Sequence, residues 1–203
     1  MLDRWALDLL RPALDGAARA LVRRGVGADA VTWTGFALSV AGAAAIAGEV
    51  GLAGLALLLA GRLADGLDGA VARATRPTDR GAFLDISVDF LFYASVPLAF
   101  AIADPARNAL AAALLLAAFI GTGSTFLAFA ALAERRCLSS DAYPRKGIYY
   151  LGGLTEGTET IACFAAMCLA PRYFAWWAGG FAVLCALTVV GRLVAGWRLL
   201  RDA

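Results

Sequence analysis

Carboxylate side chains are concentrated in one short part of this apolar chain. The stretch ADGLDGAVARATRPTDRGAFLDISVDF, residues 64–90, contains five aspartates, although 61% of the 203 residues are hydrophobic. Apolar sequence precedes it (GLAGLALLLAG) and follows it (LFYASVPLAFAIA). Ionisable groups are costly inside a membrane and usually serve a function there. We therefore expect these aspartates to form a site.

Helical spacing groups the aspartates on two faces. The positions that share a face are Asp65, Asp68, Gly69 and Ala72 on the first helix, and Gly81, Asp85 and Asp89 on the second. Because a short break joins the two helices, we expect them to be antiparallel neighbours. Four carboxylates then reach a similar depth, whereas Asp79 is interpreted as a turn residue.

Four gathered carboxylates must take up protons or bind cations to avoid repulsion in a low-dielectric setting. Ligand sets made only of oxygen favour hard cations such as Mg²⁺, Mn²⁺ and Ca²⁺. Two such ions could share the four aspartates and clamp the attacking and leaving oxygens of a phosphoryl transfer. Gly69 and Gly81 leave room for a ligand, and Arg73 offers a guanidinium fork to phosphate oxygens. The pattern predicts a site that handles a pyrophosphate.

The elements that must position these residues are helices in a membrane. Residues 1–25 have the pattern of an amphipathic helix on the membrane surface, and residues 26–203 are predicted to form one membrane domain. Mean hydropathy is +0.72, and the apolar residues lie in long blocks. We expect an all-α membrane protein with six transmembrane helices, near residues 30–48, 51–74, 81–103, 108–133, 147–170 and 174–197. The chain has no histidine, which excludes histidine-based metal or acid–base chemistry.

The distribution of basic residues predicts the orientation of the chain. Sixteen of the eighteen Lys and Arg residues lie on or near one side, and only Arg107 and Arg172 lie opposite. Positive residues accumulate on the cytoplasmic side of membrane proteins. Both termini and the aspartate region are therefore expected in the cytoplasm, with the chain in the inner or plasma membrane if it is bacterial.

The aspartate spacing resembles a known family signature. The pattern is Asp65-x-x-Asp68-Gly69-x-x-Ala72-Arg73, then seven residues, then Gly81-x-x-x-Asp85-x-x-x-Asp89. It is similar to the signature of the CDP-alcohol phosphotransferases, and the arrangement of spans resembles that family over essentially the whole chain. The resemblance implies a membrane enzyme of phospholipid synthesis. Such an enzyme moves a phosphatidyl group from a CDP-alcohol, most often CDP-diacylglycerol, to an acceptor alcohol and releases CMP.

The resemblance also implies roles for individual residues. The implied ligands of two divalent cations, Mg²⁺ or Mn²⁺, are Asp65, Asp68, Asp85 and Asp89, and Asp89 is also the implied catalytic base. The residues implied to hold the CDP group are Asp68, Gly69, Ala72, Arg73 and Gly81. Expected partners are the lipid donor, a small alcohol acceptor, membrane lipids and a second copy of the chain in a homodimer. No nucleic acid is expected.

The sequence is less decisive about the acceptor. The opening GADAVTWTGF is similar to that of the family branch that makes phosphatidylinositol phosphate. In the stretch STFLAFA, however, Leu127 and Phe129 stand where that branch carries a basic pair. A phosphorylated acceptor would then lack its apparent counter-charge. We therefore expect an unphosphorylated amino-alcohol or polyol.

A second polar group lies in the stretch KGIYYLGGLTEGTETI, in which GLTEG resembles GPTEG of the choline and ethanolamine phosphotransferases. Thr155, Glu156 and Glu159 form a possible acceptor site, with Tyr149 and Tyr150 available to an amino-alcohol cation. Alternatively, the two glutamates only pair with nearby basic residues, namely Arg145, Lys146 or Arg136. Two other functions stay open: transfer from CDP-choline or CDP-ethanolamine to diacylglycerol, and transport of a divalent cation through the same aspartates.

Overall fold

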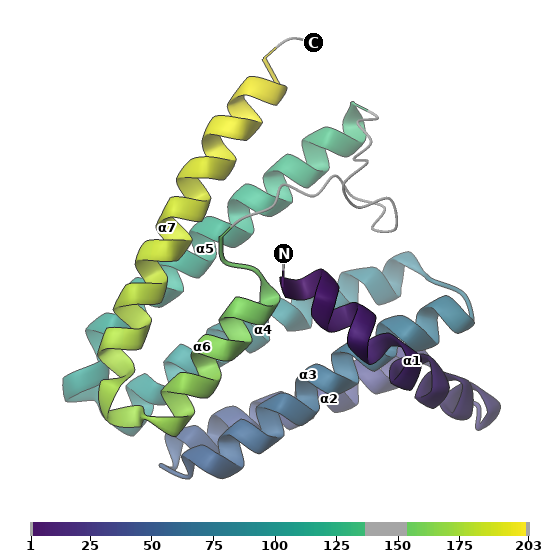
Figure 1. Cartoon of the computed structure of the whole chain (residues 1–203), viewed down its shortest axis with the longest axis horizontal. Helices are drawn as coiled ribbons and strands as arrows, with labels where there is room; N and C mark the ends of the chain where they lie inside the picture. The colour runs from purple at the N-terminus through teal and green to yellow at the C-terminus, as the bar shows by residue number, and fades with distance from the viewer. Residues whose placement is uncertain (1, 137–153, 202–203) are drawn as a thin grey trace.

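The computed structural model describes residues 2–136 and 154–201, with side chains from residue 11 onward, and contains helices and no strand within these ranges. Figure 1 shows the arrangement of the helices. In chain order they are α1 (Leu2–Arg23), α2 (Ala28–Ala47), α3 (Gly51–Ala74), α4 (Asp79–Ala103), α5 (Pro105–Arg135), α6 (Gly157–Leu169), the 3₁₀ turn η1 (Pro171–Tyr173) and α7 (Phe174–Leu199).

Four helical segments among the described residues are long and apolar enough to cross a membrane. They are α2, α4, α5, and the continuous segment Pro171–Leu199 that contains η1 and α7. Helix α3 is 24 residues long, but its second half carries several charged side chains, among them those of the aspartate motif. Helix α6 has only 13 residues, and part of the span predicted at 147–170 falls outside the described residues. The predicted count of six spans is therefore not confirmed, because charge and length set α3 and α6 apart from the other four.

Local sequence explains where α4 and α5 begin. Thr78 follows Pro77 and caps α4, because its Oγ1 accepts a hydrogen bond from the backbone N–H of Gly81 at 3.1 Å. Asp104 caps α5 in the same way by accepting from the N–H of Arg107 at 3.2 Å, and Pro105 occupies the first turn. The Thr78 cap keeps the connection from α3 to α4 short and sets the start of the helix that carries Asp85 and Asp89, whereas the Asp104 cap sets the junction between α4 and α5.

Helices α2 and α3 pack with almost no side chain between their backbones. Glycines face each other along the contact, and a Cβ atom built on Gly42 would lie 3.0 Å from the carbonyl oxygen of Gly54. Small residues permit this approach between membrane helices, where close packing replaces a hydrophobic driving force. Helix α2 also packs against α4, so it supports both helices of the aspartate motif.

Helix α1 lies across the α2–α3 pair (Figure 1). Ala18 of α1, Val31 of α2, and Ala70 and Val71 of α3 are buried together in one apolar cluster. Because Ala70 and Val71 belong to the aspartate motif, α1 covers the apolar face of that part of α3. A second, larger core lies between α2, α3, α4, α5, α6 and α7, and its largest fully buried side chains include Leu115, Phe164, Met167 and Phe174.

Candidate metal centre

Three of the predicted metal ligands come together. Asp65 and Asp68 of α3 and Asp85 of α4 each offer a carboxylate oxygen, and these three oxygens lie within 4.8 Å of one another. Helix α2 packs against both α3 and α4 and so helps to bring the two ends of the motif to one place. A cluster of three carboxylates at this separation is a ligand set for a hard divalent cation.

Asp68 provides the test of whether these residues fit a cation. Its side chain is buried, with 5% of the residue exposed, and no described residue donates a hydrogen bond to its Oδ2 atom. A buried carboxylate oxygen without a donor is unfavourable, because it has lost its hydration and gained nothing in return. A cation held by Asp65, Asp68 and Asp85 would supply the missing interaction, so the residues present fit a divalent metal ion.

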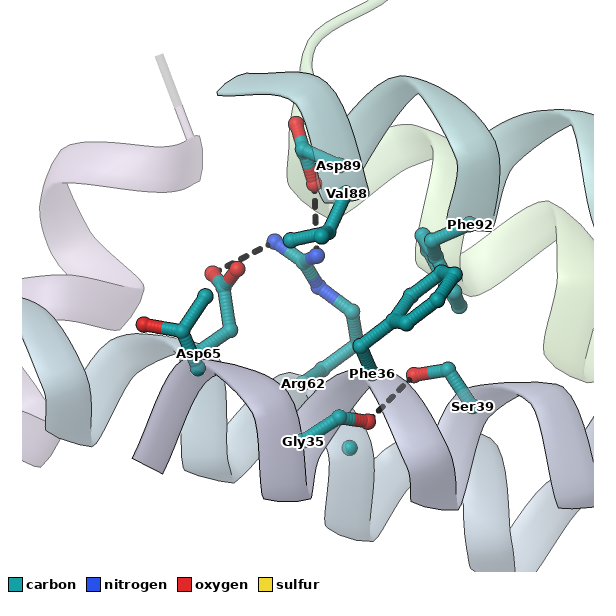
Figure 2. Close-up of a pocket in the computed structure, with 10 residues that line it drawn as sticks. Gly35, Phe36, Ser39, Arg62, Asp65, Val88, Asp89 and Phe92 are labelled. Carbon is teal, nitrogen blue, oxygen red and sulfur yellow. Dashed lines mark hydrogen bonds and ion pairs between the residues drawn. The ribbon is translucent and has the colours of Figure 1, made fainter. Parts of the chain in front are cut away.

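Asp89 has a different partner. Arg62 of α3 donates from Nη1 to Asp89 Oδ1 at 2.6 Å and from Nη2 to Asp65 Oδ2 at 2.8 Å. Figure 2 shows the guanidinium of Arg62 between the two carboxylates, with the ring of Phe92 beside it. The Arg62 Cζ atom lies 4.9 Å from the centre of that ring. The fourth carboxylate of the motif, that of Asp89, is thus paired with the guanidinium of Arg62.

Sequence reasoning missed Arg62. A signal was present, because this arginine interrupts the apolar run before the motif and stands three residues before Asp65, a spacing that brings two helical side chains together. Its reach across to Asp89, 27 positions further along the chain, depends on the arrangement of α3 and α4 and has no local signature.

The residues predicted to hold the CDP group lie around the same cluster. Gly69 faces Arg73, since a Cβ on Gly69 would lie 3.2 Å from Arg73 Nη1, and the Arg73 side chain is exposed. Gly81 lies beside Asp29 of α2, whose Oδ1 would be 3.4 Å from a Cβ there. Asp29 in turn forms an ion pair with Arg80, which ties the start of α2 to the start of α4. Ala72 is half-buried on α3, between the cluster and Arg73.

The predicted acceptor residues take part in a helix cap. Glu156 and Glu159 form a capping box at the start of α6, in which Glu159 Oε2 accepts from the backbone N–H of Glu156 at 3.2 Å. Thr155 is buried and its hydroxyl lies 3.1 Å from Thr188 Oγ1 of α7. These contacts give the glutamates a structural partner within α6. Arg136, one of the basic residues considered for them, donates instead to the carbonyl oxygen of Leu200 at 2.8 Å. Tyr149, Tyr150, Arg145 and Lys146 lie outside the described residues.

A groove between α5 and α7 contains a basic residue that sequence reasoning also passed over. The groove has a volume of about 590 Å³, and Ser124, Thr125 and Arg192 are among its lining residues. Arg192 is 8% exposed and donates from Nη1 to the carbonyl oxygen of Thr122 at 2.9 Å. Phe90, which follows Asp89 on α4, packs onto Gly123 of α5, one residue before Ser124 of the groove.

Comparison with known proteins accounts for this combination of aspartates, glycines and apolar helices. The sequence model of CDP-alcohol phosphatidyltransferases matches residues 26–191. The chain belongs to this family. The match contains the whole aspartate motif and leaves out α1 and the end of α7 from Arg192 onward, so the family assignment rests on the helices that form the cluster.

Relatives of the chain include membrane proteins and lipid synthases. The Escherichia coli K12 inner membrane protein YnjF is 50% identical over 202 residues, covering 100% of this chain and 98% of YnjF. An archaetidylinositol phosphate synthase from Methanothermobacter thermautotrophicus is 48% identical over 65 residues, which are 32% of this chain and 33% of that protein.

The fold resembles that of a phosphatidylinositol phosphate synthase from Mycobacterium tuberculosis, which is 26% identical. Its structure with CDP-DAG bound gives a TM-score of 0.73 and a match covering 91% of this chain and 93% of that one. Its structure with manganese and citrate gives a TM-score of 0.72 over 91% and 88%. This chain is therefore an integral membrane protein of a transferase family in which a structural neighbour binds a CDP-lipid and manganese.

Proposed function

We propose that this protein transfers a phosphatidyl group from CDP-diacylglycerol to the hydroxyl of a small alcohol, with release of CMP. One observation carries the proposal: the carboxylate oxygens of Asp65, Asp68 and Asp85 lie within 4.8 Å, and Asp68 Oδ2 is buried with no donor among the described residues. In this proposal, Asp65, Asp68, Asp85 and Asp89 bind two divalent cations, Mg²⁺ or Mn²⁺. When bound, the cations would neutralise the pyrophosphate and polarise its phosphorus centres.

The remaining chemistry belongs to side chains of the chain itself. In the proposed step, Asp89 accepts the proton of the acceptor hydroxyl while the hydroxyl oxygen attacks the lipid-bearing phosphorus of CDP-diacylglycerol. A new phosphorus–oxygen bond forms to the acceptor, and the pyrophosphate bond to CMP breaks. Arg73 and the backbone at Gly69 and Gly81, which carry no side chain, would bind the CDP group. We assign this site to the cytoplasmic side, where a water-soluble acceptor meets a membrane lipid, and we propose that the protein acts as a homodimer.

The first candidate acceptor is an unphosphorylated amino-alcohol or polyol. Its support is the absence of a basic pair at Leu127 and Phe129, together with Thr155, Glu156 and Glu159 at the start of α6. Carboxylates attract an ammonium group and accept hydrogen bonds from hydroxyls. The capping box binds these glutamates to backbone groups but leaves their negative charge in place.

A specific observation favours a second candidate, an acceptor that carries a phosphate. Arg192 lies in the wall of the α5–α7 groove and provides a guanidinium where the sequence pattern lacked a positive charge. The two synthases among the relatives are named for phosphorylated inositol products. Helix α5, which forms one wall of the groove, packs against α4, the helix that carries Asp89.

An acceptor screen tests both candidates. Purified protein would receive CDP-diacylglycerol, Mn²⁺ and one alcohol at a time: inositol, ethanolamine, choline, inositol phosphate or glycerol phosphate. Metal-dependent release of CMP with one acceptor is expected, and Asp85→Asn should abolish it. If no alcohol supports release, the screen is repeated with CDP-choline or CDP-ethanolamine and diacylglycerol. Metal transport in proteoliposomes without any turnover of CDP-lipids would instead identify a cation carrier.

A further inference from the structure

The aspartate motif contains a positive charge of its own. Arg62 bonds to Asp89 and Asp65 at 2.6 and 2.8 Å, and these are two of the four carboxylates proposed to bind metal. We propose that Arg62 competes with the second divalent cation, so that the site binds its first ion tightly at Asp65, Asp68 and Asp85 and its second ion more weakly. This inference rests on the proposed function, because it concerns the metal ions of that site.

The geometry separates the four carboxylates into two sets. Asp65, Asp68 and Asp85 already offer three oxygens within 4.8 Å, whereas Asp89 lies outside that cluster and bonds to Arg62. A first ion can use the three clustered oxygens without breaking the bond between Arg62 and Asp89. A second ion that uses Asp89 would stand close to a guanidinium that shares the same carboxylate.

Charge favours the same order. Four carboxylates and one guanidinium leave three formal negative charges, and one divalent cation leaves one. A second divalent cation makes the group positive, and two like charges a few ångströms apart repel strongly where water is scarce. The second ion must therefore overcome repulsion that the first ion does not meet to the same extent. A negatively charged CDP-lipid would offset that repulsion and favour the second ion when the donor is bound.

Arg62 is held in this position by packing as well as by charge. Its Cζ atom lies 4.9 Å from the centre of the Phe92 ring and 5.8 Å from that of Tyr93, both on α4. Only 22% of its side chain is exposed. A small cavity of about 10 Å³ adjoins it, with Gly35 and Ser39 of α2 in its wall (Figure 2). Because aromatic rings attract the guanidinium from one side and carboxylates from the other, Arg62 is built into the site and is not a mobile surface residue.

Titration with Mn²⁺ alone, followed by electron paramagnetic resonance, tests the inference without turnover. The unaltered protein should bind one ion tightly and a second ion more weakly. Arg62→Gln should tighten the second ion by about tenfold or more and the first by at most about threefold, because only Asp65 among the three ligands of the first ion is bonded to Arg62. Arg107→Gln is the matched control, since it removes an arginine that is paired with Asp104 at the start of α5, and it should change neither affinity.

Arg62→Lys keeps the charge but not the planar fork, so it should raise the affinity for the second Mn²⁺ ion by a smaller factor than Arg62→Gln. This variant provides the test if the Gln variant does not fold. An unchanged or weaker second ion in the folded variants, with the first ion intact, would overturn the competition and reduce Arg62 to a structural link between α3 and α4. Absence of Mn²⁺ binding in every variant would overturn the proposed metal site as well, which distinguishes the two failures.

Discussion

Gly61 of α3 lies directly against Gly35 of α2: a Cβ atom on Gly61 would stand 2.8 Å from the carbonyl oxygen of Gly35. Gly61 precedes Arg62, so this contact sets the distance between α2 and the part of α3 that begins the motif. The site therefore depends on the absence of a side chain as well as on the carboxylates.

The first prediction follows from this contact. Gly61→Val should destabilise the protein by about 1–3 kcal/mol, because the new side chain meets backbone that cannot move away without separating the two helices. Thermal unfolding in detergent would show a lower Tm, and Mn²⁺ binding should weaken because the helices that bear the ligands separate. Gly180→Val on α7 is the control, since a Cβ built there meets no other part of the described structure within 4 Å. Equal stability of the two variants would contradict this account of the packing.

The second prediction concerns Asp68. Asp68→Asn keeps the shape of the side chain but removes its charge, so the first Mn²⁺ ion should bind about tenfold or more weakly. In the absence of metal, the Tm of the protein should be unchanged or raised, because a buried oxygen that lacks a donor no longer carries charge. Isothermal titration and thermal unfolding in EDTA check the two parts. Asp79→Asn at the start of α4 is the control and should change neither.

Much of this site was predictable from sequence because its parts are local. The i,i+3 and i,i+4 spacings place Asp65 with Asp68 and Asp85 with Asp89, and they hold on any helix. Spacing alone could not show that Asp89 separates from the other three carboxylates and bonds to Arg62. The bond between Asp89 and Arg62 depends on how α3 and α4 are arranged in space. The sequence predicted that α3 and α4 pack as direct neighbours, whereas α2 packs against both of them.

Long-range arrangement also explains why the sequence did not predict the number of spans or the groove at Arg192. Composition located the apolar segments of α2, α4, α5 and α7. The charges of α3 were visible in the sequence, but the short length of α6 emerged only with its helix boundaries. Arg192 was counted among the basic residues of one side, yet its burial against α5 depends on a contact with Thr122, 70 positions away. Long-range side-chain contacts of this kind leave no periodic signal in the chain.

The third prediction concerns the base. Asp89→Asn should lower the rate of CMP release by about 10²–10⁴-fold, because an amide cannot accept the proton of the acceptor hydroxyl. Binding of CDP-diacylglycerol should be partly preserved, since the cluster of Asp65, Asp68 and Asp85 is left in place. Single-turnover release of CMP and equilibrium binding of the donor measure the two effects. Full turnover in this variant would refute the assignment of Asp89 as the base.

The fourth prediction separates the acceptor role of Glu156 from its role in the helix cap. Glutamine can retain the hydrogen bonds of a capping box but not its charge. Glu156→Gln should therefore leave the Tm of the protein within experimental error and raise the acceptor KM, with kcat little changed. Glu156→Ala, which loses the cap as well, should also lower stability by about 1 kcal/mol. An unchanged KM in the Gln variant would leave these glutamates with a structural role only.

The fifth prediction tests whether the groove at Arg192 receives a phosphate. Charge-assisted hydrogen bonds contribute about 1.5–3 kcal/mol, so Arg192→Gln should raise the KM for inositol phosphate or glycerol phosphate by about tenfold to a hundredfold. The same variant should leave the KM for inositol, ethanolamine or choline unchanged, because these acceptors carry no phosphate. Arg198→Gln, an exposed position on the same helix, is the control and should affect neither group. If the unaltered protein accepts no phosphorylated alcohol, or if Arg192→Gln affects all acceptors equally, the groove is not a phosphate site and the unphosphorylated acceptor is favoured.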